Sequence, residues 1–179
     1  VVAAKTDEAH WKLSKLFAER SVFKEYRAFV WGSPKPESGI INASIGRSSK
    51  NRKKFIVSDS GREARTRYRT ISNFGIMSLI ELILETGRTH QARVHLGFIG
   101  YPIVGDLIYG GGLRHLRCLR KKEVDLGKLV LSKVERQMLH AYRIRFCHPF
   151  KDKNVEIEAP LPEDFISVES ILRTGYYQQ

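Results

Sequence analysis

The spacing of hydrophobic residues differs from one part of the chain to the next, and these differences predict which segments are helices and which are strands. Apolar residues three or four positions apart predict amphipathic helices over residues 7–20 and from Pro162 onward, with a third over 89–99 that ends at Gly100. Alternating apolar, aromatic and β-branched residues predict strands over residues 23–31, 40–45, 64–71, 76–84, 139–146 and 154–159. A polar hairpin is expected over 46–61, and the stretch 113–136 looks basic and irregular, with short helix at most.

Many short strands with few helices favour an α+β fold. We expect a largely antiparallel, mixed sheet flanked by helices. The chain has 179 residues, a length that suits a single domain over 1–179. No apolar run approaches the roughly 18 residues that cross a bilayer, so no membrane partner is expected. The two cysteines have neither disulfide-framework nor metal-ligand spacing, and a reducing, cytoplasmic location is the default expectation.

Positive charge exceeds negative charge by 12, which narrows the class of partner. Dense basic runs occupy residues 47–54, 62–69 and 114–122. Cations placed on phosphates release counterions, so such a surface gains salt-dependent affinity for nucleic acid. One isolated run would more simply be a solvated face, but several runs in one chain favour a polyanion. The candidate phosphate contacts in the first run are Arg47, Arg52, Lys53 and Lys54.

The segment from residue 84 to 109 carries the most chemical information. An apolar strand leads into a glycine, and a helix is then predicted to begin close to Arg88. The unpaired N–H groups of a helix start attract anions, and Arg88 and Arg93 add full charges nearby. From these residues alone, an anion site and an ordinary capped helix with solvated arginines are equally supported.

This segment closely resembles the third signature of the RluA-type pseudouridine synthases, whose pattern reads TGRTHQxRVHxxxxGxPxxGDxxYG. The chain matches it from Thr86 to His95 and again at Gly100, Pro102, Gly105, Asp106, Tyr109 and Gly110. Residues 24–32 resemble the family's KxYxAxVxG strand, and residues 136–149 resemble its RQxLHAxxLxFxHP strand. The resemblance spans nearly the whole chain and is nearest to enzymes of large-subunit ribosomal RNA.

Membership of this family would imply isomerisation of uridine to pseudouridine in RNA, after the base has left its stack. No metal and no redox cofactor is implied. By motif position, Tyr26 would stack on the base or assist a proton transfer, and Arg93 would pair with the catalytic aspartate, with Arg88 the second choice. Asp106 is expected to be a turn residue that accepts backbone N–H groups. The remaining candidate RNA contacts are Arg88, Thr89, His90 and His95.

The family's nucleophile is an aspartate in an HRLDxxTSG motif, and that motif does not occur in this chain. The chain begins at Val1 with the apolar strand that follows the motif in the family. We therefore expect a truncated copy of a monomeric enzyme. Two alternatives stay open: a non-catalytic RNA-binding protein on the same fold, and a metal-dependent hydrolase using the histidines. His90 and His95 are five residues apart, which does not place two ligands on one helical face.

Overall fold

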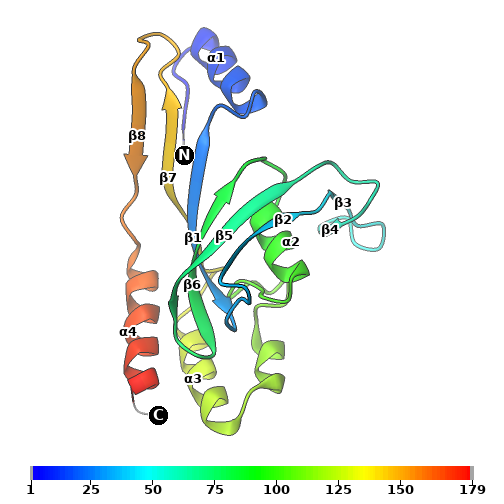
Figure 1. Ribbon diagram of the computed structural model, residues 1–179, viewed down its shortest axis with the longest axis vertical. Coiled ribbons are helices and arrows are strands. Elements are labelled where there is room, and N and C mark those ends of the chain that lie inside the picture. The colour runs from blue at the N-terminus through cyan, green and yellow to red at the C-terminus, as the bar shows by residue number, and fades with distance from the viewer. Residues whose placement is uncertain (1, 178–179) are drawn as a thin grey trace.

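A computed structural model describes residues 2–177 of the chain (Figure 1). The elements in chain order are α1 (Asp7–Ala18), β1 (Phe23–Trp31), β2 (Ser38–Asn42), β3 (Ile45–Arg47), β4 (Phe55–Val57), β5 (Arg65–Asn73), β6 (Met77–Leu84), α2 (Gln91–Phe98), the 3-10 helix η1 (Leu113–Cys118), α3 (Lys121–Ser132), β7 (Leu139–Cys147), β8 (Asn154–Glu158) and α4 (Glu163–Tyr177).

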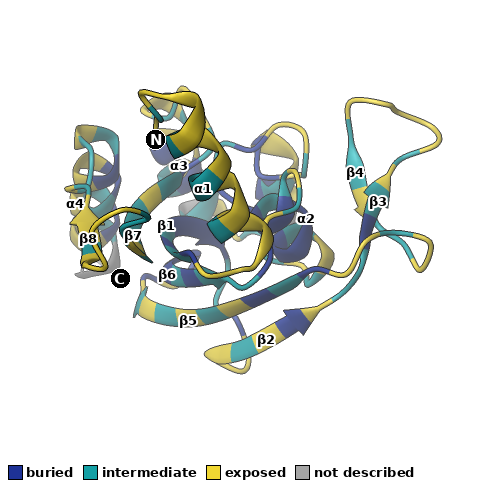
Figure 2. Ribbon diagram, turned by 90° about the horizontal axis from the view of Figure 1, so that it is seen from above, coloured by how far each residue is buried: buried dark blue, intermediate teal, exposed yellow. Residues whose placement is uncertain are grey.

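Six strands form one sheet in the order β2-β5-β6-β1-β7-β8, and every neighbouring pair is antiparallel. The short strands β3 and β4 pair separately and form a hairpin that projects from the body (Figure 2). The expected α+β class is confirmed, and within residues 2–177 no parallel pair joins the sheet.

Local sequence accounts for the first two elements directly. The Thr6 hydroxyl accepts the N–H of Ala9 at 3.2 Å and caps α1 as predicted, with acidic residues in the first turn, where the helix dipole favours them. Strand β1 has the predicted bounds, and its last four residues are buried. It is one of the two central strands of the sheet, and β6 and β7 pair with its two edges.

Helices cover the two faces of the sheet at different places. The α2 side chains of Gln91 and His95 bond to Thr66 of β5, so α2 covers the face on which Thr66 lies. Phe165 of α4 packs on Phe29 of β1 with ring centroids 5.4 Å apart, and the alternation of the strand places Phe29 on the opposite face. The apolar core lies where these packings meet at β1 and β6.

Three stretches differ from the pattern-based prediction. Residues 2–4 have no regular structure although their apolar character predicted a strand, and residues 40–45 are divided between β2 and β3. The stretch 113–136, expected to be irregular, contains η1 and the twelve-residue helix α3. Val130 of α3 is fully buried, and Gly127 leaves room for the Trp31 ring. Burial of this face stabilises α3, and a basic sequence with a central glycine does not predict that packing.

Candidate functional site

A buried glutamine holds the loop between β6 and α2 against strand β5. The Gln91 side-chain oxygen accepts the Thr86 hydroxyl at 2.6 Å and the Arg88 N–H at 3.0 Å. Its amide nitrogen donates to the Arg65 carbonyl at 2.9 Å and to the Thr66 hydroxyl at 3.0 Å. All four hydrogen-bonding positions of the amide are therefore used in a side chain that is 2% exposed. We call residues 85–90 the arginine loop, because this network fixes the backbone of Arg88.

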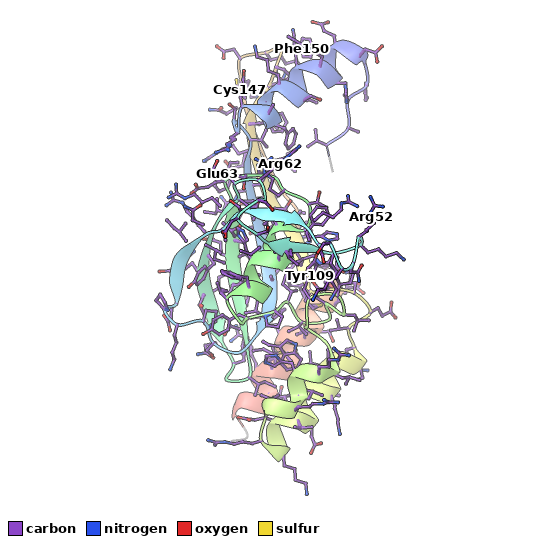
Figure 3. All side chains as sticks on the ribbon, turned by 90° about the vertical axis from the view of Figure 1, so that its right-hand side faces the viewer. Arg52, Arg62, Glu63, Tyr109, Cys147 and Phe150 are labelled. Carbon is purple, nitrogen blue, oxygen red and sulfur yellow. The ribbon has the colours of Figure 1, made fainter. Side chains whose placement is uncertain are left out.

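The Arg88 guanidinium is half-buried and is held through one nitrogen. Its Nε donates to the Glu63 carbonyl at 2.9 Å. Within residues 2–177 its two terminal amino groups form no hydrogen bond or ion pair. The Glu63 carboxylate is paired with Arg20 at 3.0 Å, and this hydrogen bond lowers the pKa of that carboxyl. Figure 3 shows Glu63 and Arg62 beside each other on this side of the molecule. Arg88 thus offers two donors to an incoming anion.

Arg93 pairs with Asp106, whereas motif position suggested a pair with the catalytic aspartate. Its Nε and one terminal nitrogen bind the two oxygens of Asp106 at 2.7 and 2.9 Å, a bidentate pair. The Asp106 side chain is fully buried and also accepts the N–H groups of Ile108 and Tyr109, both at 3.1 Å. The turn role predicted for Asp106 is confirmed. The two guanidinium nitrogens that were predicted to bind a catalytic aspartate bind Asp106 in this structure.

Tyr26 lies on strand β1, on the face that α2 covers. It pairs with Leu82 of β6. Strand β6 ends two residues later, at Leu84, and the arginine loop follows directly. The pairing of β1 with β7 shifts register between Glu25 and Tyr26, and such bulges redirect a side chain. Burial raises the pKa of the Tyr26 phenol, so the half-buried ring stays neutral at physiological pH. A neutral ring at this position can stack on a base and donate one proton.

His90 connects the start of α2 to the hairpin through Tyr109. Its backbone is left-handed, with φ of 57° at the N-cap, and its Nδ1 lies 2.9 Å from the Tyr109 hydroxyl. That hydroxyl accepts the N–H of Phe55 in β4 at 3.1 Å. Burial, and secondarily the charge of Arg93, lower the pKa of His90. Contacts of His90 and the exposed Thr89 with RNA stay predictions.

His95 was predicted to contact RNA, and the structure contradicts this. Its ring is fully buried, with Nδ1 2.9 Å from the Thr66 hydroxyl and Nε2 2.9 Å from the Ala43 carbonyl. Burial lowers the pKa of His95, so a neutral ring that donates to the carbonyl suits both contacts. His95 ties α2 to the sheet and presents no surface to a ligand.

The predicted phosphate contacts of the first basic run lie together on the β3–β4 hairpin. Arg47, Arg52 and Lys53 are exposed and Lys54 is half-buried. Arg47 donates to the Arg52 carbonyl at 3.1 Å and lies over the Phe55 ring at 5.1 Å from its centroid. In Figure 3, Arg52 lies at the outer end of the hairpin and Tyr109 at its base. We call residues 47–54 the basic hairpin.

Sequence reasoning missed the residues that hold the site in place. Gln91 and Tyr109 stand within the recognised motif, but only their positions in the fold give each of them bonds to two separate elements. Among residues 2–177, no cluster of three or more His, Cys, Asp or Glu side chains could hold a metal ion. Within the same part of the chain, no helix combines the length and apolar character needed to cross a membrane.

Comparisons with known proteins point to one family. The family described as RNA pseudouridylate synthase matches residues 1–97. An uncharacterized RNA pseudouridine synthase of Chlorobaculum parvum is 42% identical over 178 residues, 97% of this chain and 54% of that protein. The ribosomal large subunit pseudouridine synthase D of Zymomonas mobilis is 43% identical over 166 residues, 92% of this chain and 49% of that protein.

A solved structure extends the likeness to the fold. The human RNA pseudouridylate synthase domain containing 1 protein superposes with a TM-score of 0.71 at 28% identity, covering 94% of this chain and 66% of that one. The chain spans about half the length of the curated relatives that it matches. The family resemblance read from the motifs is confirmed: this chain belongs to the RNA pseudouridylate synthase family, among its RluA-type members.

Proposed function

We propose that the protein containing this chain isomerises uridine to pseudouridine in RNA, with large-subunit ribosomal RNA as the substrate. In this reaction the N1–C1′ bond of uridine breaks and a C5–C1′ bond forms, while the C5 proton leaves and N1 gains a proton. Relatives at 42–43% identity are named for the ribosomal large subunit, which supports the choice of RNA. We further propose that it acts as a monomer in the cytoplasm.

The arrangement of the arginine loop is the observation that carries this proposal. Gln91 fixes the loop, and Arg88 keeps two donors available at the end of the strand that pairs with Tyr26. We propose that Arg88, and not Arg93, pairs with the catalytic aspartate, which a segment preceding Val1 would supply. Paired guanidinium hydrogen bonds keep a buried carboxylate ionised, as a nucleophile or base requires. Tyr26 would stack on the flipped base and assist the proton transfer at C5.

Tritium release tests the proposal. The extended protein, meaning this chain preceded by its own upstream coding sequence, is incubated with ribosomal RNA that carries tritium at uridine C5. Isomerisation releases the label to water, and pseudouridine is identified in the digested RNA. We expect release by the extended protein, and loss of release with Arg88→Ala.

Failure has a clear form in the same assay. If the extended protein binds the RNA tightly and releases no tritium, the non-catalytic RNA-binding alternative replaces the proposal. If release persists in Arg88→Ala and is lost in an Arg93→Lys protein that folds normally, the two arginine roles are reversed.

A further inference from the structure

An apolar groove lies beside the basic hairpin and is separate from the candidate catalytic residues. It has a volume of about 930 Å³ and is walled by β4, α2 and the loop that follows Leu107. Neither Tyr26 nor Arg88 lines it. A volume of this order is within the roughly 300–1,000 Å³ range of small-molecule sites. Room for a ligand therefore exists outside the proposed reaction centre.

Several apolar side chains that line the groove are exposed to solvent. Phe98, at the end of α2, is 61% exposed. Leu107 on the loop and Leu113 at the start of η1 are 85% and 66% exposed. Single exposed apolar residues are ordinary, but several around one hollow indicate a binding surface. Phe98 provides an aromatic face on which a flat ring can stack.

The charges of the groove select the ligand. Among the residues that the structure describes, Lys54 and Arg114 are the only charged residues that line it, and both are positive. Within the described part of the chain neither side chain forms an ion pair, so both are available to an anion. Lys54 also belongs to the basic hairpin, so the exposed cations of that hairpin lie next to the groove. A ligand that matches both features has a flat apolar part and a negative charge close to it.

Glycine backbone forms part of two walls of the groove, α2 and the loop after Leu107. Gly97, Gly110 and Gly112 line it and add no side chain to its walls. Gly110 has φ of 96°, a conformation that residues with a side chain rarely adopt, so replacing this glycine would strain the backbone. A nucleobase is a planar aromatic ring whose faces are apolar and whose polar groups lie at its edges, and in RNA it is joined to a phosphate backbone. Single-stranded nucleic acid binds proteins by stacking combined with cationic contacts.

We propose that this groove binds an unpaired base of the RNA substrate, a base other than the target uridine. The base stacks on Phe98, and its flanking phosphates contact Lys54 and Arg114. The inference rests on the proposed function because it takes RNA as the ligand. It adds a requirement for a single-stranded nucleotide near the target. A protein occupant is less well supported because an acidic partner would have to match the basic hairpin as well.

Binding of short RNAs tests the groove directly. Fluorescence anisotropy of the extended protein is measured with a single strand of about ten nucleotides and with a blunt duplex of the same length, over a range of salt. Phe98→Ala should weaken binding of the single strand about 5- to 150-fold and leave its salt dependence unchanged, because a stacking contact is lost and no cation is removed. Binding of the duplex should hardly change.

Three further variants isolate the cause. Phe98→Trp should bind the single strand as well as the parent protein, because the stacking face is kept. Trp11→Ala removes an aromatic side chain of similar exposure, 64%, on the distant helix α1 and should have no effect. Lys54→Gln should reduce the slope of log affinity against log salt by about 0.7.

Two results would overturn the inference. One is a Phe98→Ala protein that binds the single strand like the parent. The other is a Phe98→Ala protein that loses self-association in sedimentation while RNA binding is intact, which would make the groove a contact between copies. Tritium release is read separately. If Phe98→Ala weakens single-strand binding and the extended protein releases no tritium, this inference holds and the proposed function is wrong. If Phe98→Ala binds the single strand like the parent and the extended protein releases tritium, the proposed function holds and this inference is wrong.

Discussion

The ion pair of Arg93 and Asp106 makes the sharpest prediction, because it distinguishes a structural arginine from a functional one. In Arg93→Ala the Asp106 carboxylate, which has 0% of its side chain exposed, loses both guanidinium hydrogen bonds. Removing one partner of a buried pair lowers the free energy of unfolding by about 3–5 kcal/mol. Two backbone N–H groups still bind Asp106, so we expect the lower part of that range.

Arg88 supplies the matched comparison. Its side chain forms one hydrogen bond, to the Glu63 carbonyl, and loss of such a bond costs about 0.5–1.5 kcal/mol. Urea unfolding of the extended protein, followed by circular dichroism, should therefore separate the two alanine variants by about 1.5 kcal/mol or more. Tritium release should rank them in the opposite order, with the more stable Arg88→Ala protein losing turnover.

Arg93→Lys keeps the experiment decisive if Arg93→Ala does not fold. Lysine retains the charge and loses the two-pronged contact, so its stability should fall between the parent and the alanine variant. The reasoning fails if Arg93→Ala unfolds at the same urea concentration as the parent and still loses tritium release. That result would mean that Asp106 does not depend on Arg93, and that Arg93 acts in the reaction.

Three other measurements examine the support around the site. Burial lowers the pKa of His95, so the stability that its neutral ring contributes is complete above about pH 6.5 and is lost as pH falls through the lowered folded-state pKa; NMR titration should find this ring less protonated at about pH 6.5 than an unfolded control, which is half protonated there. Tyr109→Phe removes the acceptor of the Phe55 N–H, and hydrogen exchange at that amide should speed up by about fivefold or more, equivalent to about 1 kcal/mol, while amides in β1 stay protected. Replacing the three cations at residues 52–54 by glutamine should reduce the salt slope of single-stranded RNA binding by about two, whereas an unchanged slope would make them a solvated face.

The sequence by itself determined the features that depend on neighbouring residues. Strand β1 has the bounds that its alternation predicted, and the hydroxyl of Thr6 caps α1 as expected. Fixed spacing between Thr86 and Gly110 was enough to identify the family, because such a motif records local backbone requirements together with chemistry. The basic hairpin was also foreseen, since exposed cations need no partner from elsewhere in the chain.

Only the tertiary structure decided which of the motif's polar residues are buried. Arg88 and Arg93 are five positions apart on the chain, and no periodicity shows that the loop after Ile103 brings Asp106 to Arg93. His95 looked like a ligand contact until the fold enclosed it between Thr66 and Ala43, residues 29 and 52 positions away. The free energy of a charged or polar side chain depends on whether water or a partner surrounds it, and long-range packing sets that environment.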